Sequence, residues 1–151
     1  MFAPYRHTQI GLMLRVAAIL PVAPLIGLGF IIDNPLPLTL LAAVLVFLAL
    51  AFSTLTIEVA PGVLSWRFGF GLWRRSVPLA EIASVTPVRN PWWYGWGIHK
   101  TPRGWLYNVS GLQAVEIVLK SGSVFRLGTD EAARLARALT PQNTPEPSSS
   151  A

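Results

Sequence analysis

The sequence predicts a transmembrane hairpin of two helices, followed by an all-β barrel of about seven antiparallel strands that a C-terminal α-helix caps. Three observations lead to this fold class. Only 13% of the residues are charged, which is about half the usual share of a soluble domain. Residues 16–57 contain a single charge, that of Asp33. After Ile57, apolar and polar residues alternate and all 6 tryptophans follow, a pattern typical of half-buried strands.

Two uncharged runs, residues 16–32 and 34–57, lie on either side of Asp33. A helix rises about 1.5 Å per residue, so a hydrocarbon core of about 30 Å needs about 20 residues. The first run becomes long enough if its helix starts at Ile10 and Arg15 extends its charge to the headgroups. The sequence therefore predicts transmembrane helices at 10–32 and 38–57, a short external turn at 33–37 and an N-terminal tail at 1–9.

A helix pair buried in a soluble domain and a cleavable signal peptide are the alternatives for these runs. The rest of the chain is too small to cover two such apolar helices. No small-residue cleavage site closes the first run, and a second spanning run follows at once. Positive charges flank the outer ends of the helices and are absent from the turn; they belong to Arg6, Arg15, Arg67, Arg74 and Arg75. The positive-inside rule then predicts that both termini are cytoplasmic.

The segment 58–140 is predicted to be one domain, because turn residues divide it into short alternating strands. These are expected at 56–59, 63–68, 73–77, 81–88, 105–110, 115–120 and 124–127. Thr129 then has the character of an N-cap, and Ala132, Leu135 and Leu139 form an apolar stripe at helical spacing. Closing the sheet into a barrel would remove its two exposed edges. The Pro/Ser-rich residues 141–151 are predicted to be a disordered tail.

Four stretches of this domain resemble bacterial pleckstrin-homology-like (PH-like) domains fused to membrane helices, an uncharacterised group. They are Pro78–Val85, Gly95–Ile98, Arg103–Tyr107 and Phe125–Asp130. The resemblance implies a PH-like barrel on the cytoplasmic side of a bacterial inner membrane. Eukaryotic relatives of the fold bind phosphoinositides through a basic first loop. The corresponding turn here, residues 60–62, has no lysine or arginine, so that activity is not carried over.

Few residues of the chain are suited to catalysis. There is no cysteine, which also excludes a disulfide scaffold, and the 2 histidines are His7 and His99. A metal site needs a cluster of such ligands. Ser110, His99 and Asp130 could be written as a catalytic grouping, but nothing here resembles the strained turn that activates a nucleophilic serine. We therefore expect no cofactor, no metal and no enzymatic activity. Nucleic-acid binding is also disfavoured, because the basic residues are dispersed and no recognition motif accompanies them.

The segment 89–107 combines tryptophans, tyrosines and cations in a glycine- and proline-rich stretch. The candidate site residues are Arg89, Trp92, Trp93, Tyr94, Trp96, Lys100, Arg103 and Trp105. Three interpretations stay open: the aromatic rings fill the mouth of the barrel, they lie among anionic lipid headgroups, or they bind a protein or small ligand.

From these observations we expect an integral membrane protein whose PH-like domain is held against the bilayer. It would act as an interaction or assembly module for an unknown protein partner. The alternative is a domain that binds or senses a lipid or small amphiphile.

Overall fold

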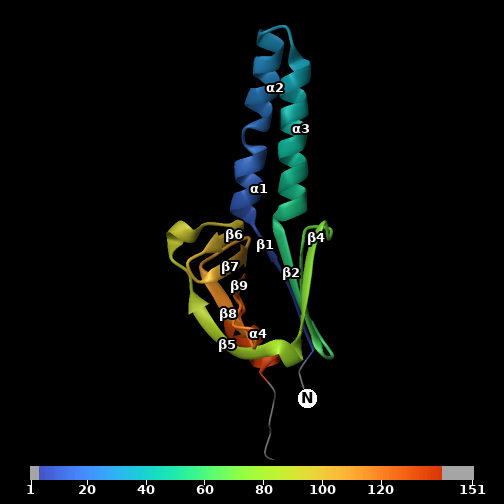
Figure 1. Ribbon diagram of the computed structural model, residues 1–151. Coiled ribbons are helices and arrows are strands. Elements are labelled where there is room, and N and C mark those ends of the chain that lie inside the picture. The colour runs from blue at the N-terminus through green and yellow to red at the C-terminus, as the bar shows by residue number, and fades with distance from the viewer. Residues whose placement is uncertain (1–3, 141–151) are drawn as a thin grey trace, which may run out of the picture.

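The computed structural model describes residues 4–140, so the predicted tail at 141–151 lies outside the described residues, as do residues 1–3 of the predicted N-terminal segment. A pair of apolar helices rises from a mainly β-structured domain that ends in a helix (Figure 1). This confirms the coarse prediction of two apolar helices followed by strands and a C-terminal helix.

The helix pair consists of α1 (Leu12–Ile19), α2 (Val22–Ile31) and α3 (Pro35–Phe52). Residues 12–31 and α3, with 20 and 18 residues, are each long and apolar enough to cross a membrane. The first helix is broken between α1 and α2, because Pro21 and Pro24 cannot donate to carbonyls of the preceding turn. Most of the apolar side chains on this pair face outward, and no residue of α1 is buried.

A strand precedes the helices. β1 (Tyr5–Ile10) pairs antiparallel with β2 (Thr54–Ala60), so the helix pair is inserted between two neighbouring strands. The amide of Gly11 donates to the carbonyl of Ser53 at 2.6 Å and continues the ladder to the base of the helices. The predicted tail at 1–9 therefore includes an ordered strand, and β2 begins where the second helix was still expected.

The strands form two open sheets rather than a closed barrel of seven strands, so that part of the predicted fold class is wrong. The four-stranded sheet has the order β1-β2-β3-β4, and the five-stranded sheet has the order β5-β8-β9-β7-β6. Neighbouring strands are antiparallel except β7 and β9, which are parallel. The further strands are β3 (Val63–Phe68), β4 (Trp73–Pro78), β5 (Ile82–Arg89), β6 (Gly97–Thr101), β7 (Gly104–Asn108), β8 (Gln113–Leu119) and β9 (Val124–Gly128).

Two strands explain the difference in number. β1 adds to the edge of the first sheet from before the helices, and β6 lies within the stretch expected to be a long loop. Between β4 and β5 the short 3₁₀ helix η1 (Leu79–Glu81) carries the chain from one sheet to the other, so the two sheets do not join into a cylinder.

The core lies between the two sheets. Trp66 of β3 stacks on Phe125 of β9, with ring centroids 4.9 Å apart, and also meets Tyr107 of β7. Leu135 and Leu139 of α4 (Ala132–Leu139) belong to the same buried cluster. Thr129 accepts a hydrogen bond from the amide of Glu131 at 3.1 Å, just before this helix begins. α4 lies at the end of the domain away from the helix pair (Figure 1).

Candidate functional site

One end of the β-domain adjoins the base of the helix pair, and strands from both sheets reach it. Gln9 of β1 donates through Nε2 to the carbonyl of Ser110 at 3.1 Å. The amide of Asn90 donates to the carbonyl of Leu112 at 2.7 Å. These contacts place the ends of β5, β7 and β8 beside the strand that leads into α1.

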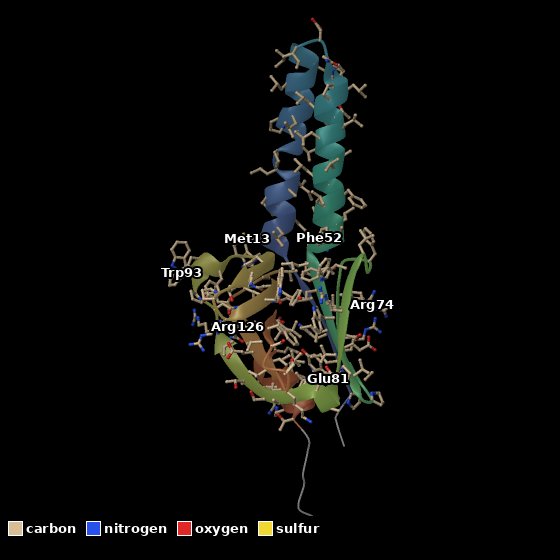
Figure 2. All side chains as sticks on the ribbon, in the orientation of Figure 1. Met13, Phe52, Arg74, Glu81, Trp93 and Arg126 are labelled. Atoms are coloured by element: carbon tan, nitrogen blue, oxygen red, sulfur yellow. The ribbon has the colours of Figure 1, made fainter. Side chains whose placement is uncertain are left out.

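The aromatic loop, residues 90–96, begins at this end of the domain and returns to it, since Gly97 pairs with Asn108 at the end of β7. Its middle is a single 3₁₀ turn, η2 (Trp92–Tyr94). Trp93 lies at about the level of Met13 in α1 and Phe52 in α3, displaced sideways from the helices (Figure 2). The loop thus lies at the level where the chain enters and leaves the helix pair.

The tryptophans of the aromatic loop face solvent. Trp92 is 76% exposed, Trp93 67% and Trp96 45%. The rings of Trp92 and Trp93 meet edge to face, with centroids 6.0 Å apart. These side chains do not fill the core, where Trp66 is 3% exposed. The two interpretations in which the loop meets something outside the domain therefore stay open.

A buried polar cluster fixes the start of the loop. The guanidinium of Arg126 donates through Nε and Nη2 to Oε2 of Glu116, at 2.8 and 2.7 Å, and through Nη1 to Oδ1 of Asn90, at 2.8 Å. Arg126 is 8% exposed, and its neighbours Phe125 and Leu127 face the core. Its charge therefore serves the structure, and sequence reasoning missed it because Asn90 gives no local pattern.

The other candidate residues lie in different places. Lys100 and Trp105 face each other across the β6–β7 pair, and Arg103 occupies the turn that joins these strands. That turn is at the opposite end of the β6–β7 hairpin from Trp96. The structure therefore separates this group from the aromatic loop instead of joining all the candidates into one surface.

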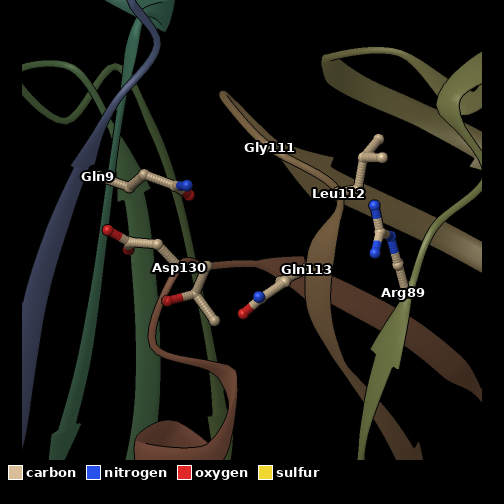
Figure 3. A pocket seen from close by; sticks show the side chains of 7 residues that line it. Gln9, Arg89, Gly111, Leu112, Gln113 and Asp130 are labelled. Atoms are coloured by element: carbon tan, nitrogen blue, oxygen red, sulfur yellow. The ribbon is translucent and has the colours of Figure 1, made fainter.

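Arg89, the last residue of β5, lines a cavity of about 280 Å³ at the same end of the domain (Figure 3). Gln9 and Asp130 approach it from one side and Arg89 from the other. Gln9 is 8% exposed, and its Oε1 has no hydrogen-bond partner among the described residues. The full lining consists of Gln9, Arg89, Gly111, Leu112, Gln113, Thr129 and Asp130. Sequence reasoning missed this cavity, because it depends on β1.

β1 is also tied to the start of α4. Nε2 of His7 lies 2.6 Å from Oδ1 of Asp130, and its Nδ1 lies 3.5 Å from Glu131. Tyr5, at the start of the same strand, is buried, and this burial raises the pKa of its hydroxyl to about 12. Asp130 therefore pairs with His7 rather than with His99, and within residues 4–140 no cluster of three or more histidines and carboxylates could hold a metal ion.

Comparison of the chain with protein families, with curated proteins and with solved structures gave no match. The functional interpretation therefore rests on the sequence and on the geometry of the helix-proximal end of the domain.

Proposed function

We propose that this chain is a non-enzymatic, two-pass protein of a bacterial inner membrane, and that its β-domain acts there as a protein-interaction or assembly module. One observation carries the proposal: Trp92 and Trp93 are largely exposed on a loop that lies at the level of the base of two apolar helices. Tryptophan is enriched both at membrane interfaces and among the residues that dominate protein contacts.

Membrane insertion is supported by the helix pair. Its apolar side chains face outward, and burying them in lipid removes a large apolar surface from water. Because β1 pairs with β2, both outer ends of the pair lie on one side of any membrane it crosses. The positive-inside rule makes that side the cytoplasm, since arginines occur near these ends and Asp33 lies in the external turn.

The PH-like relationship is part of the proposal for the domain. Two facing sheets with a terminal helix at one end agree with it. The parallel pairing of β7 with β9 and the added strand β1 depart from an all-antiparallel arrangement of seven strands. Under this proposal, the domain is an elaborated member of that group.

The position of the aromatic loop defines the kind of partner. The loop lies at the level where the helices leave the β-domain and extends sideways from them (Figure 2). A protein that covers Trp92 and Trp93 would therefore be embedded in the membrane or held on its surface. The buried Arg126–Asn90 bond fixes the first residue of the loop, so this residue needs no ordering on binding.

Purification of the full-length protein in mild detergent tests this function. We expect a defined membrane protein to co-purify in constant ratio, and to be lost from the variant W92A/W93A/W96A. The matched control K120A/R137A changes two exposed residues distant in sequence from the loop and should retain the partner. Equal recovery of the partner with the triple variant would contradict the proposal.

Binding of a small amphiphile is the second candidate, and the cavity beside Gln9 favours it. The unpartnered Oε1 of Gln9 offers an acceptor and Arg89 a positive charge to the same space. Mass spectrometry of the same preparation would then detect a bound lipid or metabolite in place of a protein. The variant R89A should lose that ligand.

A further inference from the structure

The turn between β3 and β4, residues 69–72, is the hairpin tip, and it reaches along α3. The ring of Phe70 lies 6.2 Å from the ring of Phe47. Phe47 precedes the end of α3 at Phe52 by five residues, which corresponds to about 7.5 Å along the helix axis. If α3 spans a bilayer, as the proposed function holds, Phe70 lies within the acyl region rather than above it.

Backbone contact holds the hairpin tip against the helix. Gly69 has φ +50°, and a Cβ atom at this position would overlap the carbonyl oxygen of Ala51. Only glycine lets the turn come this close. The two apolar side chains beyond it are left uncovered, Phe70 being 60% and Leu72 59% exposed. The tip thus presents an apolar surface at a fixed depth beside α3.

Two arginines lie on the strands of the hairpin, close to this tip. Arg67 of β3 and Arg74 of β4 face each other in the antiparallel pair. Like charges directly opposite each other repel, and neither guanidinium has a carboxylate within ion-pair distance among the described residues. Glu58 lines the same shallow depression on the sheet without pairing with them. Arg74 is exposed and Arg67 half-buried, so the pair is accessible to an anion from outside the domain.

The depth of the two arginines fits a headgroup. Thr56, which pairs with Arg67, follows the end of α3 by four residues, or about 13 Å along a strand. The headgroup layer on each side of a bilayer is about 5–8 Å thick, and arginine side chains extend back toward the interface to reach such a layer. The apolar tip lies toward the hydrocarbon and the two arginines lie farther from it. An anionic lipid has the same order of apolar chains and charged headgroup.

We propose that the β3–β4 hairpin is a binding site for an anionic phospholipid, whose acyl chains contact Phe70 and Leu72 while its phosphate is bound by Arg67 and Arg74. The site rests on the membrane placement in the proposed function, but it lies on the other sheet from the aromatic loop and does not involve a protein partner. Two long side chains at one phosphate also favour lipids with a net negative charge.

Native mass spectrometry of the full-length protein, titrated with phosphatidylglycerol or phosphatidylcholine, tests the phosphate end. We expect phosphatidylglycerol to bind more tightly, and R67Q/R74Q to lose about 10- to 30-fold in affinity for it. The charge-matched control K120Q/R137Q should keep the preference. Unchanged affinity of R67Q/R74Q would overturn the site, and so would displacement of the lipid by millimolar inorganic phosphate.

Fluorescence quenching tests the apolar end. In nanodiscs, brominated acyl chains should quench a tryptophan introduced as F70W, measured against the W92F/W93F/W96F background. L41W, in the middle of α3, is the reference for membrane insertion. Quenching of L41W without quenching of F70W would overturn the lipid site alone. Absence of quenching in both would overturn the membrane placement itself.

Discussion

The helix-proximal end of the domain has two flanks of different chemistry. The aromatic loop of the five-stranded sheet presents Trp92 and Trp93, whose rings are apolar but carry an N–H donor. The hairpin tip of the four-stranded sheet presents Phe70 and Leu72, which carry no polar atom. Amphipathic rings favour the headgroup level, whereas purely apolar side chains favour the hydrocarbon. Under the proposed membrane placement, this difference would put the two flanks at two depths of the bilayer.

The two flanks are also held in place differently. The start of the aromatic loop depends on a buried ion pair with an added amide, Arg126 with Glu116 and Asn90. The hairpin tip depends on the close approach of Gly69 to the backbone of α3. The aromatic loop is therefore sensitive to the loss of a charge in its ion pair, whereas the hairpin tip is sensitive to the addition of a methyl group at Gly69.

The largest expected effect is that of E116A on the aromatic loop. It leaves the guanidinium of Arg126, 8% exposed, without its carboxylate, which costs about 3–5 kcal/mol for a buried pair. Denaturant unfolding in detergent, followed by tryptophan fluorescence, measures this loss. E58A removes a carboxylate that makes no ion pair within the described residues and should change stability by less than about 0.5 kcal/mol. Equal effects of the two variants would show that this cluster does not stabilise the folded domain.

The next effect compares one glycine from each flank. Gly69 and Gly95 both have positive φ, +50° and +64°, but a Cβ at Gly95 meets nothing within 4 Å. Gly95 has ψ −158°, an extended positive-φ conformation that essentially only glycine adopts, so G95A should cost only this backbone strain, about 1–3 kcal/mol. In G69A the new methyl group would also overlap the backbone of Ala51, which should lower the stability by about 1–3 kcal/mol more. Thermal unfolding measures both, and a larger effect for G95A would contradict the contact with α3.

The smallest effect concerns β1, the strand that joins the two flanks by pairing with β2 and contacting Ser110. Burial raises the pKa of Tyr5 from 10.0 to about 12. The unfolded chain thus releases this proton first, so stability is retained below pH 10 and falls as the pH rises toward 12. At pH 11 the loss of stability is on the order of 1 kcal/mol.

The variant Y5F isolates this ionisation from that of the other tyrosines and lysines. The wild type should lose more stability than Y5F between pH 9 and pH 11, as measured by denaturant unfolding at each pH. Parallel losses in the two proteins would mean that Tyr5 does not become buried on folding.

The parts of the fold that the sequence predicted are those with local patterns. Leu64, Trp66 and Phe68 alternate with polar residues, and the strand at 63–68 has the predicted bounds. β1 escaped prediction because its inward positions include Gln9 and its partner lies beyond the whole helix pair. β6 escaped because Gly97–Thr101 shows no clear alternation. Closure into a barrel failed as a prediction because it depends on which edges meet, a non-local property.

The same distinction applies to the candidate site. Composition alone identified the tryptophans of the aromatic loop, and the structure shows them exposed. Composition did not indicate that Lys100, Arg103 and Trp105 lie at the other end of the β6–β7 hairpin, because the pairing of the two strands determines their position. Phe70 was left out since nothing in its neighbourhood shows that it meets Phe47.

The insertion of the helices between β1 and β2 also orders the biogenesis of the protein. During synthesis β1 leaves the ribosome first, whereas β2 follows only after both helices have been made. Under the proposed membrane insertion, β1 would stay unpaired until both helices have entered the bilayer and β2 has been made. Pairing of β1 with β2 then joins the two outer ends of the helix pair in one sheet. The completed sheet would keep the helices in one orientation, because reversing either helix would require the domain to unfold first.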